Sequence, residues 1–189
     1  MLLSELKSFH LKEIESKSGI KVRFRPEKRG DVEGVWALYS SLSDESKKSL
    51  PPFDHELIER WSENLNQYTF PPILATVATG LNEERIIGRA VLTHNDRPSL
   101  RHRAEFGIVV HDDYQNQGIG TELTKFMLDI AGKHGLMKVT LEVFSENKKA
   151  IHVYEKCGFI KEGLLTNHYF FHERLYDVVL MSYTIKNWD

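Results

Sequence analysis

The sequence predicts a mixed α/β domain, in which one central, twisted and mostly antiparallel sheet is flanked by helices. First, extended apolar segments and amphipathic helical segments alternate along the chain instead of forming separate halves. Second, strand-like segments at 104–110 and 138–144 enclose an amphipathic helix, which is the order that a parallel β–α–β crossover requires. Third, 189 residues with 41% hydrophobic and 28% charged residues suit one domain with a substantial core.

The first segment is predicted to be helical. Ser4 can cap a helix over residues 4–18, Gly19 can end it, and apolar residues recur at helical spacing between them. We therefore expect residues 1–19 to be a helical extension that packs on the domain or on a second copy of the chain. Residues 20–189 are expected to form the single domain.

A strand and two helices are predicted to follow. Residues 20–25 alternate apolar and basic side chains, as in a strand, and Pro26 stops them. Asp31 begins an amphipathic helix, and Asp54 can cap a second one. Between the two helices, residues 41–48 form a polar connection with room for a short helical turn.

The middle of the chain reads as strands. Residues 73–79 and 85–93 are strand-like and are joined by a plausible hairpin turn, and Gly88 inside the second of them indicates a bulge. A third strand ends at Val110. We expect these three strands to be antiparallel neighbours.

The last third alternates helices and strands. The helix after Val110 is expected to end at Gly135, and residues 138–144 alternate as a strand. Residues 147–157 fit a short helix ended by glycine, and two further strands turn near residues 172–173. The helices and strands therefore follow one another as in one α/β unit, without an internal repeat or a linker.

Composition narrows the function classes. The formal net charge of −2 gives no attraction to nucleic acid or membrane, and no apolar run reaches the roughly 20 residues needed to span a bilayer. The nine histidines show no metal-ligand spacing, so no metal is expected. Cys157 is the single cysteine, which excludes an internal disulfide, and the N-terminus does not resemble a signal peptide. A cytoplasmic protein is the expectation.

The stretch from Gln115 to Thr121 lies where the strand pattern changes to the helical pattern. The first amides of a helix are free and carry a partial positive charge, and Gly118 and Gly120 let an anion approach the backbone. No Lys-Ser/Thr pair follows Gly120, which argues against a P-loop, and Leu123 replaces the third glycine of a Rossmann fingerprint. A phosphate cradle of backbone amides remains, as does a plain helix cap without a ligand.

A second polar group lies on the helix after residue 144. Asn147, Ala150, Ile151 and Tyr154 recur at i, i+3, i+4 and i+7, so they share one helix face. The amide of Asn147 can donate and accept hydrogen bonds, and the Tyr154 phenol is an acid with an ordinary pKa near 10. Taken alone, a tyrosine in this setting is more often a core or interface residue.

Together these two stretches resemble the GNAT family of acetyl-CoA-dependent N-acetyltransferases. Gln115-Asn116-Gln117-Gly118-Ile119-Gly120 is similar to the Q/R-x-x-G-x-G/A motif of the family. The stretch from Asn147 through Tyr154-Glu155-Lys156-Cys157-Gly158-Phe159 is similar to its N…A…(L/V)YEKxGF motif. The resemblance extends from about residue 85 to the C-terminus, and it implies a GNAT acetyltransferase domain over residues 20–189 with strands 104–110 and 138–144 splayed apart around a cleft.

The resemblance also implies roles for individual residues. Amides from Gln117 to Thr121 would hold the CoA pyrophosphate, and backbone groups from Ile108 to Val110 would pair with the pantetheine arm as an added strand would. An N–H of Ile108 or Val109 would polarise the thioester carbonyl. Tyr154 would protonate the departing thiolate. The implied contacts of acetyl-CoA are Ile108, Val109, Val110, Gln115, Asn116, Gln117, Gly118, Ile119, Gly120, Thr121, Asn147, Ala150 and Tyr154.

Glu105 is the candidate general base, because the attacking amine must lose its proton. Alternation along the strand places Glu105 with Gly107 and Val109, whereas Ala104 faces the other way with Phe106, and a bulge in this strand could reset the facing. A structural or substrate-orienting role for Glu105 is the alternative. Glu142 is expected to be a surface or pairing residue, and Cys157 a buried packing residue, since direct transfer needs no covalent step.

The sequence leaves the acceptor open. The acceptor site would be built from helices within 31–66 and the last hairpin around 168–174, and these segments carry mixed charges. A protein lysine or N-terminus, a small amine such as a polyamine, amino acid or antibiotic, and a non-catalytic acyl-CoA-binding module all remain. Acetyl-CoA and an amine are the expected partners, and a second copy of the chain is a candidate one.

Overall fold

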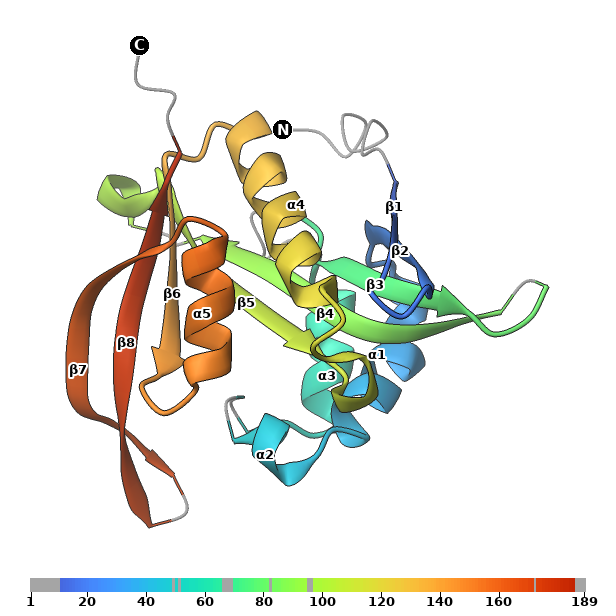
Figure 1. Cartoon of the computed structure of the whole chain (residues 1–189), viewed down its shortest axis with the longest axis horizontal. Coiled ribbons are helices and arrows are strands. Elements are labelled where there is room, and N and C mark those ends of the chain that lie inside the picture. The colour runs from blue at the N-terminus through green and yellow to red at the C-terminus, as the bar shows by residue number, and fades with distance from the viewer. Residues whose placement is uncertain are drawn as a thin grey trace.

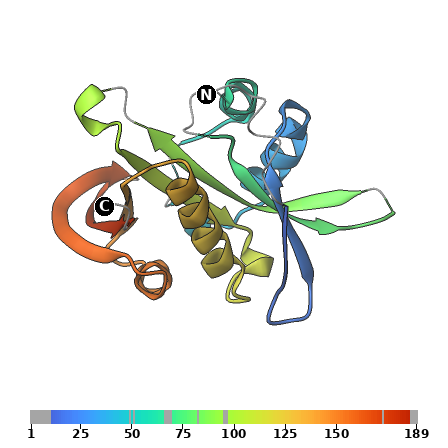
Figure 2. The same cartoon turned by 90° about the horizontal axis from the view of Figure 1, so that it is seen from above.

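The computed structural model describes residues 11–48, 50, 52–65, 70–81, 83–94, 97–171 and 173–185. These residues form a mixed α/β fold around an eight-stranded sheet of order β1-β2-β3-β4-β5-β6-β8-β7. Helices α4 and α5 cover one face of the sheet, and α1 and α3 cover the other (Figures 1 and 2). The predicted fold class is therefore confirmed, including the parallel pair formed by β5 and β6.

The element bounds agree with the predicted order from residue 20 onward. The strands are β1 (Lys12–Glu15), β2 (Lys21–Pro26), β3 (Ile73–Ala78), β4 (Glu84–His94), β5 (Arg103–Val110), β6 (Lys138–Phe144), β7 (Ile160–Phe171) and β8 (Arg174–Thr184). The helices are α1 (Val32–Ser40), α2 (Asp44–Lys47), α3 (His55–Glu63), α4 (Ile119–Lys133) and α5 (Lys148–Lys156).

The predicted N-terminal helix is wrong where the structure describes it. Lys12–Glu15 form β1, which pairs antiparallel with β2, and Gly19 makes the hairpin turn at φ 81° instead of ending a helix. The physical reason is tertiary. Pairing with β2 supplies the backbone hydrogen bonds and lets Ile14 pack against the core, which outweighs a weak local helix preference. Residues 4–10 of that prediction lie outside the described residues.

Local signals were reliable elsewhere. The Asp54 side chain accepts a hydrogen bond from the Leu57 amide at 2.8 Å and caps α3 as predicted. The β3–β4 register shifts beside Gly88, which confirms the bulge, and Gly135 follows α4 with φ 75°. The final hairpin turns near Glu173.

The sheet is split between β5 and β6. The ladder of these two fully described strands comprises three pairs, Arg103 with Lys138, Ala104 with Val139 and Glu105 with Thr140. Beyond them, β5 stays paired with β4 up to Val110, and β6 stays paired with β8. Figure 1 shows the two strands diverging toward their C-terminal ends.

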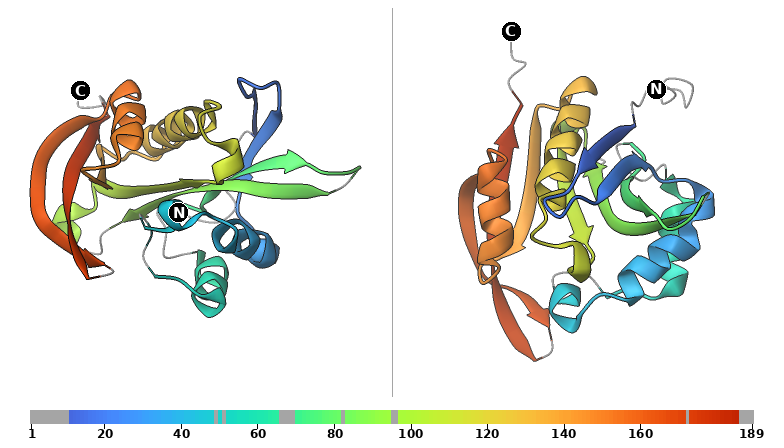
Figure 3. Two further views of the ribbon diagram at one scale, coloured as in Figure 1. Left: turned by 60° about the horizontal axis from the view of Figure 1, so that its bottom comes forward. Right: turned by 45° about the vertical axis from the view of Figure 1, so that its right-hand side comes forward.

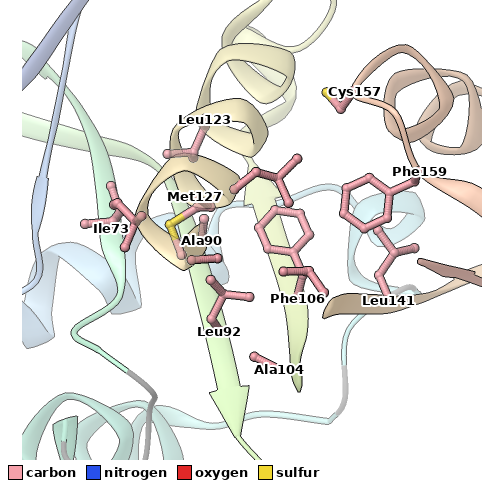
Figure 4. Close-up of a cluster of buried hydrophobic side chains, with 14 of the residues drawn as sticks. Ile73, Ala90, Leu92, Ala104, Phe106, Leu123, Met127, Leu141, Cys157 and Phe159 are labelled. Atoms are coloured by element: carbon pink, nitrogen blue, oxygen red, sulfur yellow. The ribbon is translucent and has the colours of Figure 1, made fainter. Parts of the chain in front are cut away.

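Two apolar clusters hold the helices on the sheet. The larger lies under α4 and α5, where Leu123 and Met127 pack over Ala90 and Leu92 of β4, and Phe106 and Phe159 lie side by side (Figure 4). The smaller cluster joins α1 and α3 to the opposite face of the sheet (Figure 3, left). Together they fix the C-terminal end of β5 and the start of α4, where the candidate site lies.

A buried ion pair braces the face that carries α1 and α3. The guanidinium of Arg89 on β4 lies 2.6 Å from the carboxylate of Glu27, and both side chains are 2% exposed or less. Ser62 of α3 donates a second hydrogen bond to Glu27 at 2.6 Å, and the Glu27 amide donates to the Pro72 carbonyl at 2.7 Å. The network therefore ties α3, β4 and the residue before β3 to the segment that follows β2.

Candidate functional site

The loop between β5 and α4 presents backbone amides. Asn116 and Gly118 have φ values of 60° and 85°, and alternating left-handed residues of this kind turn successive amides toward one side. Gly118 is the N-cap of α4, and within the described residues no side chain caps that helix. The first intrahelical bond comes from the Glu122 amide. Three amides of the first turn, from Ile119 to Thr121, therefore lack intrahelical acceptors.

Two glutamine side chains hold this loop in shape. The Gln115 amide nitrogen donates to the Val110 carbonyl at 3.1 Å and to the Ser46 hydroxyl at 3.2 Å. The Gln117 amide nitrogen donates to the Asp113 carbonyl at 3.0 Å. Both residues were expected among the cofactor contacts. Their side chains position the backbone of the loop, and their contacts with the cofactor stay a prediction.

Gly120 leaves room over the amides. A Cβ atom at this position would meet only a Val110 methyl group at 3.8 Å, and its φ is not positive, so the protein's own packing does not require glycine here. A phosphate lying against the amide would require it, because a side chain would occupy the same space. The residues of this loop therefore fit a phosphorylated ligand.

The edge of β5 that faces β6 carries the backbone groups of Ile108 and Val110 beyond the end of the ladder. The His111 amide donates to the Ile87 carbonyl of β4 at 2.8 Å, and backbone groups alternate in direction along a strand. Val109 has the parity of His111, so its amide is directed toward β4, where Val109 pairs with Arg89. The amide of Ile108 is directed toward the side on which the β6 ladder has ended. Of the two backbone amides that the sequence left open as donors, only that of Ile108 is therefore directed away from β4.

Tyr154 lies on α5 beside this strand. Its ring packs edge-on against Phe106 at 6.3 Å between centroids and against Phe159 at 5.8 Å. Within the described residues its hydroxyl makes no hydrogen bond. Burial raises the pKa of the Tyr154 phenol well above its ordinary value of 10, so the group keeps its proton at neutral pH. It can act as a proton donor.

Asn147 is placed differently from its expected position on the helix face. It is the N-cap of α5, and its side-chain oxygen accepts a hydrogen bond from the Ala150 amide at 3.0 Å. The oxygen is thereby used in capping, and the side-chain nitrogen remains as a donor. Ala150 and Tyr154 follow one turn apart on α5, as the spacing predicted.

Cys157 has the environment of a packing residue. It is buried, its thiol lies 3.7 Å from the Thr121 carbonyl of α4, and burial raises its pKa. A raised pKa disfavours the thiolate, which is the reactive form. The residue links the end of α5 to the first turn of α4, which agrees with the prediction of a packing role.

Glu105 lies on the sheet face opposite α4 and α5. The β4–β5 register runs without a shift from Gly88–Val110 to His94–Ala104, so no bulge resets the facing of β5. Ala104 accordingly packs in the cluster under α4, and Glu105 points the other way. Desolvation and the negative charge of Glu142 raise the pKa of Glu105, and the positive charge of Arg103 opposes them.

Glu142 joins the same face from β6. The Tyr169 hydroxyl donates to its carboxylate at 2.8 Å, and a His168 ring nitrogen lies 3.7 Å from the same oxygen. Burial and this carboxylate raise the pKa of Tyr169 to about 12. The last hairpin thus holds Glu142 beside Glu105 through specific contacts, which a general surface residue would not need.

Sequence reasoning missed Asp112, which anchors α2 beside the site. Its carboxylate accepts hydrogen bonds from the Ser43 amide and hydroxyl, both at 2.8 Å, and from the Ser46 hydroxyl at 2.7 Å. Burial alone would raise the pKa of Asp112, but these hydrogen bonds lower it overall. The partners lie 66 and 69 residues apart in the sequence, so no local pattern could reveal them.

Two classes of site find no support in the described residues. No group of three or more histidine, cysteine, aspartate or glutamate side chains among them could hold a metal ion. In the same part of the chain, every helix is too short or too polar to cross a membrane.

Comparisons with known proteins agree with the geometry. The model of the acetyltransferase (GNAT) family matches residues 35–159. A spermidine N(1)-acetyltransferase of Vibrio cholerae is 40% identical over 83 residues, which are 43% of this chain and 48% of that protein. A [ribosomal protein bS18]-alanine N-acetyltransferase of Escherichia coli is 35% identical over 81 residues, 43% of this chain and 55% of that protein. The match thus spans about half the length of these curated relatives.

The fold has a counterpart among solved structures. The ribosomal-protein-S5-alanine acetyltransferase from Vibrio fischeri superposes with a TM-score of 0.79 over 95% of this chain and 99% of that one, at 18% identity. At that identity the likeness concerns the fold alone. Because the family model covers about two thirds of the sequence, including the loop and the helix of Tyr154, the chain belongs to the acetyltransferase (GNAT) family.

Proposed function

We propose that this protein transfers an acetyl group from acetyl-CoA directly to a primary amine. The observation that carries the proposal is the uncapped start of α4, which lies next to the unpaired side of β5 and to a protonated Tyr154. One phosphate-binding element, one open strand edge and one acid thus lie along a single path. An acyl-CoA is a long molecule with phosphates at one end and a thioester at the other.

The donor end is held by backbone groups. Amides from Gln117 to Thr121 bind the pyrophosphate, and the partial positive charge of the α4 start adds to the attraction. Ile108 and Val110 pair with the pantetheine arm as a neighbouring strand would. The Ile108 amide donates to the thioester carbonyl and stabilises the negative charge that develops on it. The Asn147 side-chain nitrogen is a further donor to the arm.

Tyr154 and Glu105 handle the protons. An amine with an ordinary pKa near 10.4 arrives charged and must lose a proton before it attacks the thioester. Glu105 faces the side of the sheet away from α4, and its raised pKa makes it a better base than an ordinary carboxylate. Tyr154 gives its proton to the thiolate as CoA leaves, which stabilises the leaving group.

The acceptor is proposed to be an amine of a protein, a lysine or an N-terminus. Tyr169, Phe170 and Leu175 on the last hairpin are 45–71% exposed and offer an apolar surface on which a peptide could lie. A small polyamine is the second candidate, supported by the paired carboxylates of Glu105 and Glu142 and by the name of the spermidine relative. A module that binds acyl-CoA without turnover needs no proton donor, so Tyr154 argues against that alternative.

A thiol-release screen tests the function. The purified protein is given acetyl-CoA together with one of two acceptor panels, and released CoA is measured. One panel holds peptides with a free N-terminus or a lysine, and the other holds small amines. Turnover above the no-acceptor background supports the enzyme, and the preferred panel decides between the acceptors. Tight acetyl-CoA binding without release on any acceptor would leave only a binding module.

The pH dependence should reveal how Glu142 acts on Glu105. Glu105→Gln removes the base and is expected to lower turnover by about 10²-fold. Glu142→Gln removes a negative charge that faces Glu105, so the Glu105 pKa falls and the acid side of the rate profile shifts to lower pH. Arg103, His168 and Tyr169 are ionisable groups of the described residues that lie near the pair, and neither substitution replaces them.

Rate profiles from about pH 5 to 9 with the preferred acceptor provide the measurement. Glu13→Gln, on the exposed β1 edge, is the matched control and should leave the profile in place. A Glu142→Gln profile that shifts to higher pH, or does not shift while Glu105→Gln is inactive, would contradict the coupling.

A further inference from the structure

The turn between β1 and β2 lies against the phosphate-binding loop. The Lys17 amide donates to the Gln117 carbonyl at 3.0 Å, and the Ser18 hydroxyl donates to the Gln117 side-chain oxygen at 2.5 Å. Figure 3 (right) shows the hairpin turn beside the start of α4. A segment that is almost 100 residues away in the sequence therefore forms one wall of the loop.

The turn is well braced. The Ser16 amide donates to the Ile20 carbonyl at 2.9 Å, and the Ile20 amide donates back to the Ser16 hydroxyl at 3.1 Å. Ser16 is 7% exposed, although it lies in a turn. On β1, Lys12 lies 3.0 Å from the carboxylate of Glu122 and thereby ties the hairpin to the first turn of α4. The position of Lys17 is thus set by the fold around it.

The Lys17 side chain runs over the N-cap of α4. Its Cγ and Cε atoms lie 3.9 Å from the point where a Cβ atom of Gly118 would stand. Within the described residues the Lys17 ammonium has no ion-pair partner, whereas Lys12 and Lys125 both pair with Glu122. A lysine stem laid over uncapped amides brings an uncompensated positive charge to the place where they gather.

The charge balance of the site makes this cation relevant. CoA carries a pyrophosphate and a ribose 3′-phosphate, and the backbone amides supply only partial charges. Glu122 in the first turn of α4 is already paired with Lys12 and Lys125, so the charge that repels the phosphates is the net charge of −2 of the whole chain. A full positive charge next to the loop would offset that repulsion.

We propose that Lys17 binds a phosphate group of CoA, so that the β1–β2 hairpin is part of the donor site. The proposal rests on the proposed function, since it assumes that acetyl-CoA is the donor. It assigns a ligand contact to the β1–β2 turn, within the segment that the sequence predicts to be a helix. The chemistry is an ammonium–phosphate pair that is partly open to solvent.

Calorimetric titration of the full chain with CoA tests the proposal. Lys17→Ala is expected to weaken binding about tenfold, the size of one charge-assisted hydrogen bond, and to reduce the salt dependence of the affinity. Lys17→Arg should keep most of the affinity. Lys21→Ala is the matched control, because Lys21 is an exposed lysine of the same hairpin that faces β1 residue Glu15 in the ladder.

A second ligand identifies the phosphate. If Lys17 contacts the 3′-phosphate, wild type and Lys17→Ala will bind 3′-dephospho-CoA equally, and if it contacts the pyrophosphate the tenfold difference will persist. Equal CoA affinity of wild type and Lys17→Ala at low salt would overturn the proposal, as would an equal loss in Lys21→Ala. A wild-type protein that binds no CoA at all would instead overturn the proposed function. Thermal unfolding of each variant shows that the hairpin still folds.

Discussion

Tyr154→Phe is expected to lower turnover by about 10²–10⁴-fold while leaving acetyl-CoA affinity close to that of wild type. The substitution removes one oxygen atom that makes no hydrogen bond within the described residues, and the ring contacts with Phe106 and Phe159 remain. What is lost is the proton for the departing thiolate. Initial rates of thiol release and a separate binding titration measure the two quantities.

The effect should be specific to this tyrosine. Tyr183→Phe is the matched control, because Tyr183 also packs against Phe159 but lies on β8. It should retain wild-type turnover. A Tyr154→Phe enzyme with unchanged turnover would exclude the phenol as the acid. A variant that loses affinity as strongly as turnover would show that the phenol binds the donor instead of acting on it.

Arg89→Met is expected to lower the free energy of unfolding by about 3–5 kcal/mol. Arg89 is the cationic partner of Glu27, whose carboxylate is fully buried. Without Arg89 that carboxylate keeps the Ser62 hydroxyl but no balancing charge, and a buried charge without compensation is strongly destabilising. Chemical denaturation at neutral pH measures the loss.

Two further variants separate charge from packing. The double variant Glu27→Gln with Arg89→Met removes both charges and should recover part of the lost stability, since a neutral pair has no ionic desolvation cost. Asp129→Ala breaks an exposed pair with Lys133 on α4 and should change stability by less than about 1 kcal/mol. Equal losses in Arg89→Met and Asp129→Ala would contradict the argument.

Features with a local cause could be predicted from the sequence. The Asp54 cap, the bulge at Gly88 and the glycine after α4 each depend on a few neighbouring residues, and each is confirmed. The amide loop and the Tyr154 helix were found for the same reason, since each is a short motif with its own spacing. The sheet face to which each β5 side chain points could also be predicted, because side chains alternate along a regular strand.

Features that depend on residues far away in the sequence could not be predicted from it. Lys12–Glu15 pair with β2 because that strand offers an open edge, and nothing within residues 12–15 encodes that edge. The Asp112 carboxylate accepts hydrogen bonds from serines that are 66 or more residues away in the sequence. Glu142 was expected to be a surface or pairing residue, but its partner Tyr169 comes from the last hairpin, 27 residues away, and could not be named. In each case tertiary packing brings the partner close, and a single sequence does not reveal that packing.

The short ladder between β5 and β6 leaves the folded sheet with backbone groups that have no strand partner. Three residue pairs join the strands, and beyond Glu105 the Ile108 and Val110 backbone groups are left without a strand to pair with on that side. The polypeptide thus folds into a sheet with an interruption in its middle. A donor arm laid along β5 would supply the missing row of hydrogen bonds, so the substrate would complete the protein's secondary structure at the moment it is bound.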